Sequence, residues 1–345
     1  MKTPIRTPVE PPVTGEAVEV STGLLWARIP MPGPLEHVNV YMFDEGDSWT
    51  VVDTGIDTSR TRAVWGDLMA GPMGGKPVSR VIATHHHLDH IGLAGWFMEQ
   101  HGATLVTTRT AYLMARMLKL DVQDAPTPQM LRFWRSSGMD AAIYAERETS
   151  RPFNTADAVS DIPLGFTRIR EGDEIEIGGR LWDVRCGNGH APEHATFWSR
   201  DGEMVIGGDQ LLASISPNIG VHTTEPDADP LGEWLESCER FKPFATDDQL
   251  ILTGHKRIFT GLPTRLRQLT DNHHTALTRL LGFMEQPRTA CECFSVLFKR
   301  EIKSGEYGLA MVEAMAHCNH LFAQGLVSRT MRGDGAYIWQ KREMA

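Results

Sequence analysis

The chain has 345 residues, of which 41% are apolar and 23% charged, so it can bury a sizeable core, and its length favours about two domains. This composition excludes a small disulfide-stapled scaffold, a disordered chain and a collagen-like chain. The formal net charge of −10 at pH 7 disfavours nucleic acid as a partner, because phosphate binding requires positive charge. No apolar run approaches the roughly 20 residues of a membrane helix, and the Pro-rich residues 1–16 contain no apolar stretch typical of a signal peptide. We therefore expect a cytoplasmic protein whose five cysteines, none in a CxxC pair, are reduced.

The apolar pattern of the first half predicts an antiparallel meander followed by α/β layering. Short β-rich runs, separated by turn residues, occupy residues 24–29, 38–43 and 49–52. From Arg60 onward the pattern alternates between helix and strand, which is typical of α/β domains. The elements expected there are a helix to about residue 69, a strand over 78–84, a helix over 93–101 and a strand over 104–107.

A helical stretch over residues 111–144 then interrupts the alternation, and we treat residues 111–150 as a helical insertion. It could be a packed helical pair, a lid over a substrate or a contact in a homodimer. Strand-like runs resume after it, at residues 174–177, 180–185, 195–198, 204–206 and 249–252.

The end of the chain predicts a separate small module. A long helical pattern beginning after Gly261 ends at residues 286–288, and it is followed by helices over 290–300 and 307–324 and by a hairpin over 326–340. Two helices and a hairpin in this order suggest a winged-helix unit. We therefore expect a tail (1–16), a catalytic domain (17–286) and a winged-helix-like domain (287–345). From residue 288 onward the net charge is only +2, which favours a structural or dimerisation role over DNA binding.

The richest segment chemically is Thr84-His85-His86-His87-Leu88-Asp89-His90, which directly follows a β-rich run. In a core each of these polar groups would need a buried partner, so they are either metal ligands or part of a solvated loop. The strand before them and the helix after them favour ligands. Imidazole nitrogen and carboxylate oxygen are ligands that zinc prefers, and a tight turn lets neighbouring residues reach two different ions.

Similar groups recur downstream, each beside glycine and each just after a strand-like run. They are Gly189-His190, Gly207-Gly208-Asp209 and Gly254-His255. A single histidine beside a glycine is usually an incidental loop residue. Three such groups in one setting, in the same chain as the His/Asp segment, favour a shared site.

The spaced pattern His85-x-His87-x-Asp89-His90, followed by His190, Asp209 and His255, resembles the metal-ligand set of the metallo-β-lactamase-fold hydrolases, as in glyoxalase II and lactonases. The segment Val52-Asp53-Thr54-Gly55 resembles the opening Asp turn of that superfamily, and the likeness covers residues 20–260. Residues 189–194 are similar to the family's Gly-His-Thr-Pro-Gly-His block, in which the first histidine is the ligand. Here Ala191 removes a hydroxyl from that block and Glu193 adds a carboxylate.

This resemblance implies an α/β fold, an αββα sandwich with two metal ions at one edge of its two sheets. The ligands that it implies are His85, His87 and His190 for the first ion, and Asp89, His90 and His255 for the second, with Asp209 bridging both. Asp89 is the implied catalytic residue, which orients the shared hydroxide and carries its proton to the leaving group. Asp53 and His194 are expected to support these ligands without binding metal. A relative with a di-iron centre and a flavin would have Glu at position 87, so His87 favours zinc, with iron or manganese as alternatives.

The tail after residue 286 resembles the winged-helix module of the branch that includes the lactamase-β-like endoribonuclease. Our leading hypothesis is a dinuclear zinc hydrolase that uses a metal-bridging hydroxide to cleave a carboxylic ester or thioester, such as a lactone or an acyl-CoA or glutathione thioester. The expected partner is a small-molecule or carrier-linked acyl substrate, and the sequence assigns no substrate-binding residue. A metal-dependent endoribonuclease or phosphodiesterase is the alternative. A DNA-binding regulator with a vestigial metal site is a third hypothesis, which the retention of all seven ligands disfavours.

Overall fold

The structure is a computed structural model that describes residues 4–298 and 300–343. The chain divides into two compact units, and each combines segments that are far apart in the sequence. The first unit contains Met1–Val122, Asn154–Pro217 and Phe241–Leu266, and the second contains Gln123–Phe153, Asn218–Arg240 and Arg267–Ala345. This grouping differs from the contiguous division at residue 286 that we expected from chain order.

A seven-stranded sheet forms the first half of the first unit. Its strands β1 to β4 are antiparallel, whereas β4 to β7 are parallel and follow the chain order. The expected meander and the α/β layering after it are therefore both present. The strands are β1 (Ala17–Ser21), β2 (Leu24–Pro30), β3 (His37–Asp44), β4 (Trp49–Val52), β5 (Val78–Ile82), β6 (Thr104–Thr108) and β7 (Thr167–Ile169).

A five-stranded sheet with the order β12-β11-β10-β9-β8 forms the second half of this unit. Its strands pair antiparallel except for β11 and β12, which are parallel. The strands are β8 (Glu174–Ile177), β9 (Arg180–Gly187), β10 (His194–Ser199), β11 (Met204–Gly208) and β12 (Leu250–Thr253).

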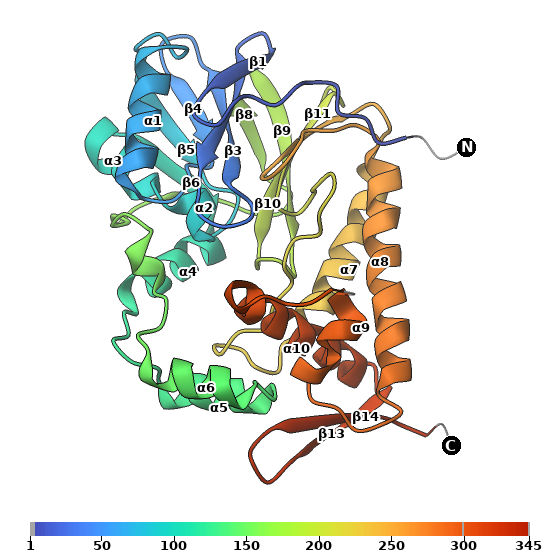
Figure 1. Ribbon diagram of the computed structural model, residues 1–345. Coiled ribbons are helices and arrows are strands. Elements are labelled where there is room, and N and C mark those ends of the chain that lie inside the picture. Colours follow the sequence, from blue (N-terminus) through green and yellow to red (C-terminus); the bar gives the residue numbers. More distant parts are fainter. Residues whose placement is uncertain (1–3, 299, 344–345) are drawn as a thin grey trace. The chain divides into compact units, whose positions relative to one another are not determined.

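Two apolar cores stabilise the first unit. One lies between the seven-stranded sheet and its covering helices, where Trp65 and Phe97 meet edge to face with ring centroids 5.0 Å apart. The other lies between the two sheets, where Phe43 contacts Trp182. The helices of this unit are α1 (Ser59–Ala70), α2 (Leu88–Ile91), α3 (Ala94–His101) and α4 (Arg109–Leu120), and α1 and α3 cover the outer face of the first sheet (Figure 1). The α/β fold class is thus confirmed.

The parallel strand pairs bring chemically active residues to one edge. Asp53 follows β4 and the histidine segment follows β5, and these two strands are parallel neighbours. In the other sheet Asp209 follows β11 and His255 follows β12, which are also parallel neighbours. Because parallel strands end at the same edge of a sheet, each sheet presents two of these segments there.

The second unit is mainly helical. The expected hairpin is present as the antiparallel pair β13 and β14. The helix expected over residues 290–300 is instead a 3₁₀ turn followed by a short helix that ends at Phe298. Residue 299 of that expected helix lies outside the described residues. The expected helix over residues 111–144 is three helices, the first of which belongs to the first unit. The elements are α5 (Pro128–Ser136), α6 (Ala141–Thr149), α7 (Pro230–Phe241), α8 (Leu262–Phe283), α9 (Phe294–Phe298), α10 (Tyr307–Ala323), β13 (Val327–Met331) and β14 (Tyr337–Lys341), with 3₁₀ turns at Cys291–Cys293 and Ser304–Glu306.

Within this unit the second part of the insertion packs on the C-terminal elements. The backbone N–H of Asp140 donates to the Tyr307 hydroxyl at 3.0 Å, and the N–H of Cys291 donates to the Ser137 carbonyl at 3.0 Å. Nowhere in residues 4–298 and 300–343 is there a helix with the length and apolar character needed to cross a membrane.

A pair of helical glycines tests the packing of the first unit. A Cβ at Gly95 in α3 would overlap the backbone carbonyl of Asp161, whereas a Cβ at Gly66 in α1 would meet nothing within 4 Å. We expect Gly95→Ala to lower the free energy of unfolding by about 1–3 kcal/mol through overpacking. Gly66→Ala should instead raise it by up to about 1 kcal/mol, because alanine favours the helix. Urea unfolding of both variants is the measurement, and equal stabilities would contradict the packing described here.

Candidate metal centre

The buried carboxylate of Asp53 organises the histidine segment. Asp53 follows β4 with a positive φ of 61°. Its Oδ1 accepts a hydrogen bond from the backbone N–H of Thr84 at 2.8 Å, and its Oδ2 accepts from His90 Nδ1 at 2.8 Å. Because Nδ1 of His90 is held in this way, its Nε2 is left to face the other polar side chains of the site. Asp53 therefore contacts both the backbone that leads into the histidine segment and the His90 ring.

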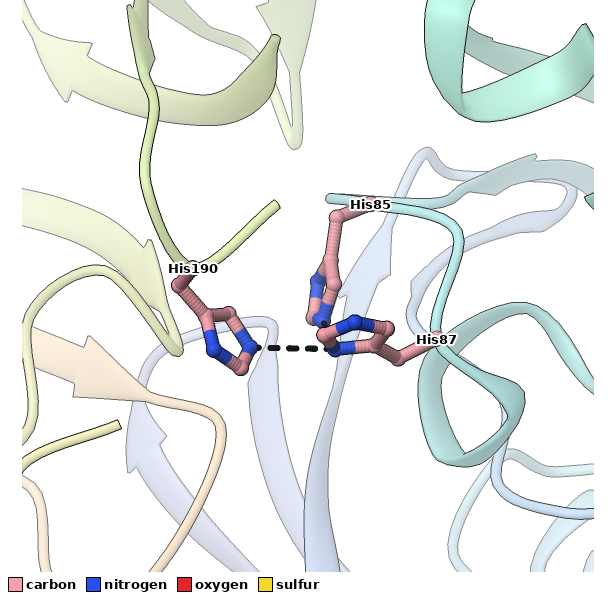
Figure 2. Close-up of side chains that lie close together, drawn as sticks. All are labelled: His85, His87 and His190. Atoms are coloured by element: carbon pink, nitrogen blue, oxygen red, sulfur yellow. Dashed lines mark hydrogen bonds between the residues drawn. The ribbon is translucent and has the colours of Figure 1, made fainter. Parts of the chain in front are cut away.

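Three imidazole rings converge from two loops. His85 and His87 come from the segment after β5, and His190 comes from the loop between β9 and β10; their rings point toward one another in Figure 2. Nδ1 of His87 lies 3.0 Å from Nε2 of His85 and 3.1 Å from Nε2 of His190. Burial, with a smaller contribution from neighbouring histidines, holds the pKa of His85 and of His87 well below the usual range. Neutral rings so arranged offer lone pairs to one point, which suits a cation.

A second group contains Asp89, His90 and His255, whose ligand atoms lie within 4.8 Å of one another. Nε2 of His255 lies 3.2 Å from Oδ2 of Asp89, while its Nδ1 donates to the His37 carbonyl at 2.9 Å. Although burial lowers the pKa of His255, the carboxylates of Asp209 and Asp89 outweigh it and raise this pKa to about 10. The same balance, with Asp209 as the largest raising influence, holds the pKa of His90 well above its usual value.

Asp209 lies between the two groups. Its Oδ2 is 3.5 Å from Nε2 of His190 and 3.3 Å from Nε2 of His255. Its Oδ1 and Nε2 of His90 are 3.5 Å apart, and both atoms are buried with no hydrogen-bond partner among the residues that the structure describes. Buried polar atoms normally have partners, so two that face each other in this way fit ligands of a shared cation. The His/Asp clusters therefore fit a metal site.

Glycines beside these side chains allow their close approach. A Cβ at Gly254 would overlap Oδ1 of Asp209, and a Cβ at Gly208 would lie 2.6 Å from Cε1 of His194. Gly208 also has a φ of 48°, which side chains rarely adopt. Two of the glycines that drew attention in the sequence, Gly208 and Gly254, are thus required by the space around the site.

His194 lies behind the cluster. Its Nε2 accepts a hydrogen bond from the backbone N–H of Asp209 at 3.2 Å, and its ring stacks on that of His85 with centroids 4.5 Å apart. Burial, followed by the influence of His190, lowers the pKa of His194 to about 3. Among the described residues, the candidate metal-binding groups are the two above and a third set of His85, His90 and Asp209, and His194 belongs to none of them.

Strand β3, for which the sequence pattern predicted no role in the site, also supports it. The His37 carbonyl orients His255, and the Asn39 amide and the Tyr41 hydroxyl donate to the Thr253 carbonyl at 2.9 and 2.7 Å. These contacts fix the end of β12, from which the His255 loop begins. Polar residues at alternate positions of an otherwise apolar strand were the available signal.

Comparisons with known proteins agree with this architecture. Residues 33–255 match the family described as metallo-beta-lactamase superfamily, and residues 277–342 match the one described as metallo-beta-lactamase-like, C-terminal domain. The chain is 26% identical over 327 residues to a Bacillus subtilis protein described as probable metallo-hydrolase YqjP, covering 90% of this chain and 96% of that protein.

Two solved structures are similar over nearly the whole chain. One, a beta-lactamase domain protein from Burkholderia ambifaria, is 32% identical with a TM-score of 0.88 and covers 98% of both chains. The other, a metallo-beta-lactamase family protein from Thermus thermophilus, is 26% identical with a TM-score of 0.77, covering 94% of this chain and all of that one. Since the superfamily match spans well over half of the sequence and extends from before Asp53 to His255, the chain belongs to the metallo-β-lactamase superfamily.

Proposed function

We propose that this protein is a dinuclear zinc hydrolase that cleaves a carboxylic ester or thioester. The observation that carries the proposal is the convergence of five imidazoles and two carboxylates, in which the Asp209 carboxylate lies 3.5 Å from His190 of one group and 3.3 Å from His255 of the other. The similarity to a protein described as a probable metallo-hydrolase supports the hydrolase class. Nitrogen-rich ligand groups favour zinc over magnesium or calcium, which prefer oxygen.

Each ion would take three ligands from one group. His85, His87 and His190 would hold the first, and Asp89, His90 and His255 would hold the second, with Asp209 between them. Two divalent ions at such a site lower the pKa of water and polarise a carbonyl or phosphoryl oxygen of the substrate. In this proposal Asp53, His194 and the His37 carbonyl hold the ligands in place.

Asp89 is the residue to which we assign proton transfer. Its side chain is 13% exposed, whereas that of His255 is 2% exposed, and the two meet at 3.2 Å. Asp89 therefore belongs to the second group and is also partly exposed to solvent. A carboxylate in this position can orient a water molecule and pass its proton to the leaving group.

Charge favours an acyl substrate over RNA. The net charge of the chain is −10, and residues from 288 onward contribute only +2, which is a weak basis for binding a polyanion. The alternative function is that of a metal-dependent endoribonuclease or phosphodiesterase, because the same metal centre can serve phosphoryl chemistry. A test of the proposed substrate class must therefore include RNA.

Metal content is the most basic expectation. Protein reconstituted with zinc should bind about two ions per chain, measured by elemental analysis after removal of free metal. Asp209→Ala should lower the occupancy of both sites, since Asp209 contacts both groups, and should leave the fold intact. Asp47→Ala, which changes an exposed turn residue, is the matched control and should still bind two ions. The absence of bound metal in the reconstituted wild type would refute the proposal.

Asp89→Asn separates metal binding from proton transfer. The amide keeps an oxygen that can act as a ligand but is a much weaker base, so turnover should fall by about two to four orders of magnitude. Metal occupancy must be measured on the same sample. A near-normal rate at full occupancy would assign the proton to another group.

A substrate panel tests the reaction class. We expect zinc-loaded protein to hydrolyse at least one of a set of acyl-CoA thioesters, glutathione thioesters and lactones, and to lose this activity with a chelator or with Asp209→Ala. RNA of the same total concentration is the competing substrate. Cleavage of RNA alone would favour the phosphodiesterase alternative and contradict the proposed substrate class.

A further inference from the structure

Backbone strain is concentrated around the metal centre. Among the described residues, the non-glycine residues with positive φ are Glu36, Asp53, Glu193 and Lys256. Asp53 supports His90, Glu36 and Lys256 adjoin His37 and His255, and Glu193 adjoins His194. Such conformations cost of order 1–3 kcal/mol each and persist where the surroundings require them. All four positions border contacts described above, and Glu193 also makes hydrogen bonds of its own.

We propose that Glu193 is a positioning residue, which fixes the His190 loop of the second sheet to the framework of the first sheet. The proposal rests on the proposed function, in which His190 is a metal ligand. Its observations are two hydrogen bonds of Glu193, one through the backbone and one through the carboxylate.

The backbone bond closes the loop around His190. The N–H of Glu193 donates to Oδ1 of Asn188 at 2.8 Å, so the residues on both sides of His190 are joined. His194, which stacks on His85, follows directly in β10. The positive φ of 50° at Glu193 allows the chain to turn from this loop into the strand.

The carboxylate bond anchors the closed loop to helix α4. Oε2 of Glu193 accepts from the backbone N–H of Thr110 at 3.0 Å, across 83 residues of sequence. The first turn of α4 contains no acidic residue, and Thr108 accepts only from Ala111 N in that turn. Glu193 therefore supplies both a hydrogen-bond acceptor and the negative charge that a helix N-terminus favours.

The hydrogen bond from Thr110 to Glu193 connects the two segments that supply the three imidazoles, which are the segment after β5 and the loop between β9 and β10. Helix α4 begins where β6 ends, and β6 is the parallel neighbour of β5, the strand that leads to His85 and His87. A loop tied to α4 is thus tied to the framework that holds the other two rings. The sheets are also joined by a bond from Ala195 N to the Thr84 carbonyl at 2.8 Å, so the fold does not depend on Glu193 alone.

Glycine at position 193 would remove the strain and the anchor together. The related block quoted above has glycine there, which adopts positive φ freely. Glu193→Gly should therefore leave the metal-free protein at least nearly as stable as the wild type, whereas a purely structural carboxylate would lose stability when removed. The effect should appear in metal binding instead.

The test measures zinc affinity by competition with a chromogenic chelator, together with urea unfolding of the metal-free protein. We expect Glu193→Gly to weaken binding of one zinc ion by about 10–100-fold, the usual effect of losing a group that orients a ligand. Glu193→Gln retains an acceptor oxygen and should restore most of the affinity. Thr110→Pro removes the donor N–H without altering the loop, and proline is tolerated in the first turn of a helix, so it should reproduce the loss. Thr110→Ser keeps the N–H and is its matched control.

The double variant decides whether the two residues act through one bond. Glu193→Gly combined with Thr110→Pro should lose no more zinc affinity than either single variant. If the wild type binds two zinc ions, the proposal would be overturned by a Glu193→Gly variant with wild-type zinc affinity. It would also be overturned by a double variant whose loss of binding free energy equals the sum of the two single losses. A wild-type protein that binds no zinc would overturn the proposed function together with this inference.

Discussion

The free energy cost of burying many polar side chains at one edge of the sheets is the constraint on which this structure depends. His85, His90, Asp209 and His255 are all buried, and burying imidazoles and carboxylates is unfavourable unless each polar atom has a partner. The pKa values show two solutions side by side. Burial holds the pKa of His85 well below its usual value, whereas neighbouring carboxylates raise the pKa of His90 and of His255. A bound cation would offer a partner to the imidazole lone pairs and to the carboxylates, and on binding it would take the place of protons on these nitrogens.

The rest of the first unit holds this cluster in place. Asp53, the His37 carbonyl and His194 each contact one side of it, so ring orientation is fixed from outside the group of ligands. Behind them lie two apolar cores, which make the strand ends rigid. Well-packed strands can also hold the neighbouring non-glycine residues at positive φ, a conformation that a loosely packed loop would not maintain.

Local patterns in the sequence predicted those features that depend on neighbouring residues. The runs that form β2, β3 and β4 either alternate between apolar and polar residues or are continuously apolar. The close spacing of His85, His87, Asp89 and His90 in the sequence indicated the site. The structure brings these side chains together with His190, Asp209 and His255. Strand β7 was missed because it has only three residues, two of them exposed, and therefore no apolar period.

Features that join distant segments could not be predicted in this way. The bond from Thr110 to Glu193 spans 83 residues, and although Glu193 departs from the related block, nothing in the sequence around it identifies Thr110 as its partner. The second compact unit likewise combines residues 123–153 with the end of the chain, through contacts such as that of Asp140 with Tyr307. Periodicity describes one element at a time, whereas these contacts depend on where the sheets and helices meet.

In the proposed function the two His/Asp groups hold two metal ions, with Asp209 contacting both. Anomalous diffraction from crystals of the zinc-loaded protein, recorded on both sides of the zinc absorption edge, tests it most directly. We expect two anomalous peaks, one among His85, His87 and His190 and one among Asp89, His90 and His255, with the Asp209 carboxylate between them. A single peak that leaves one group empty, or peaks only at other surfaces of the protein, would contradict it.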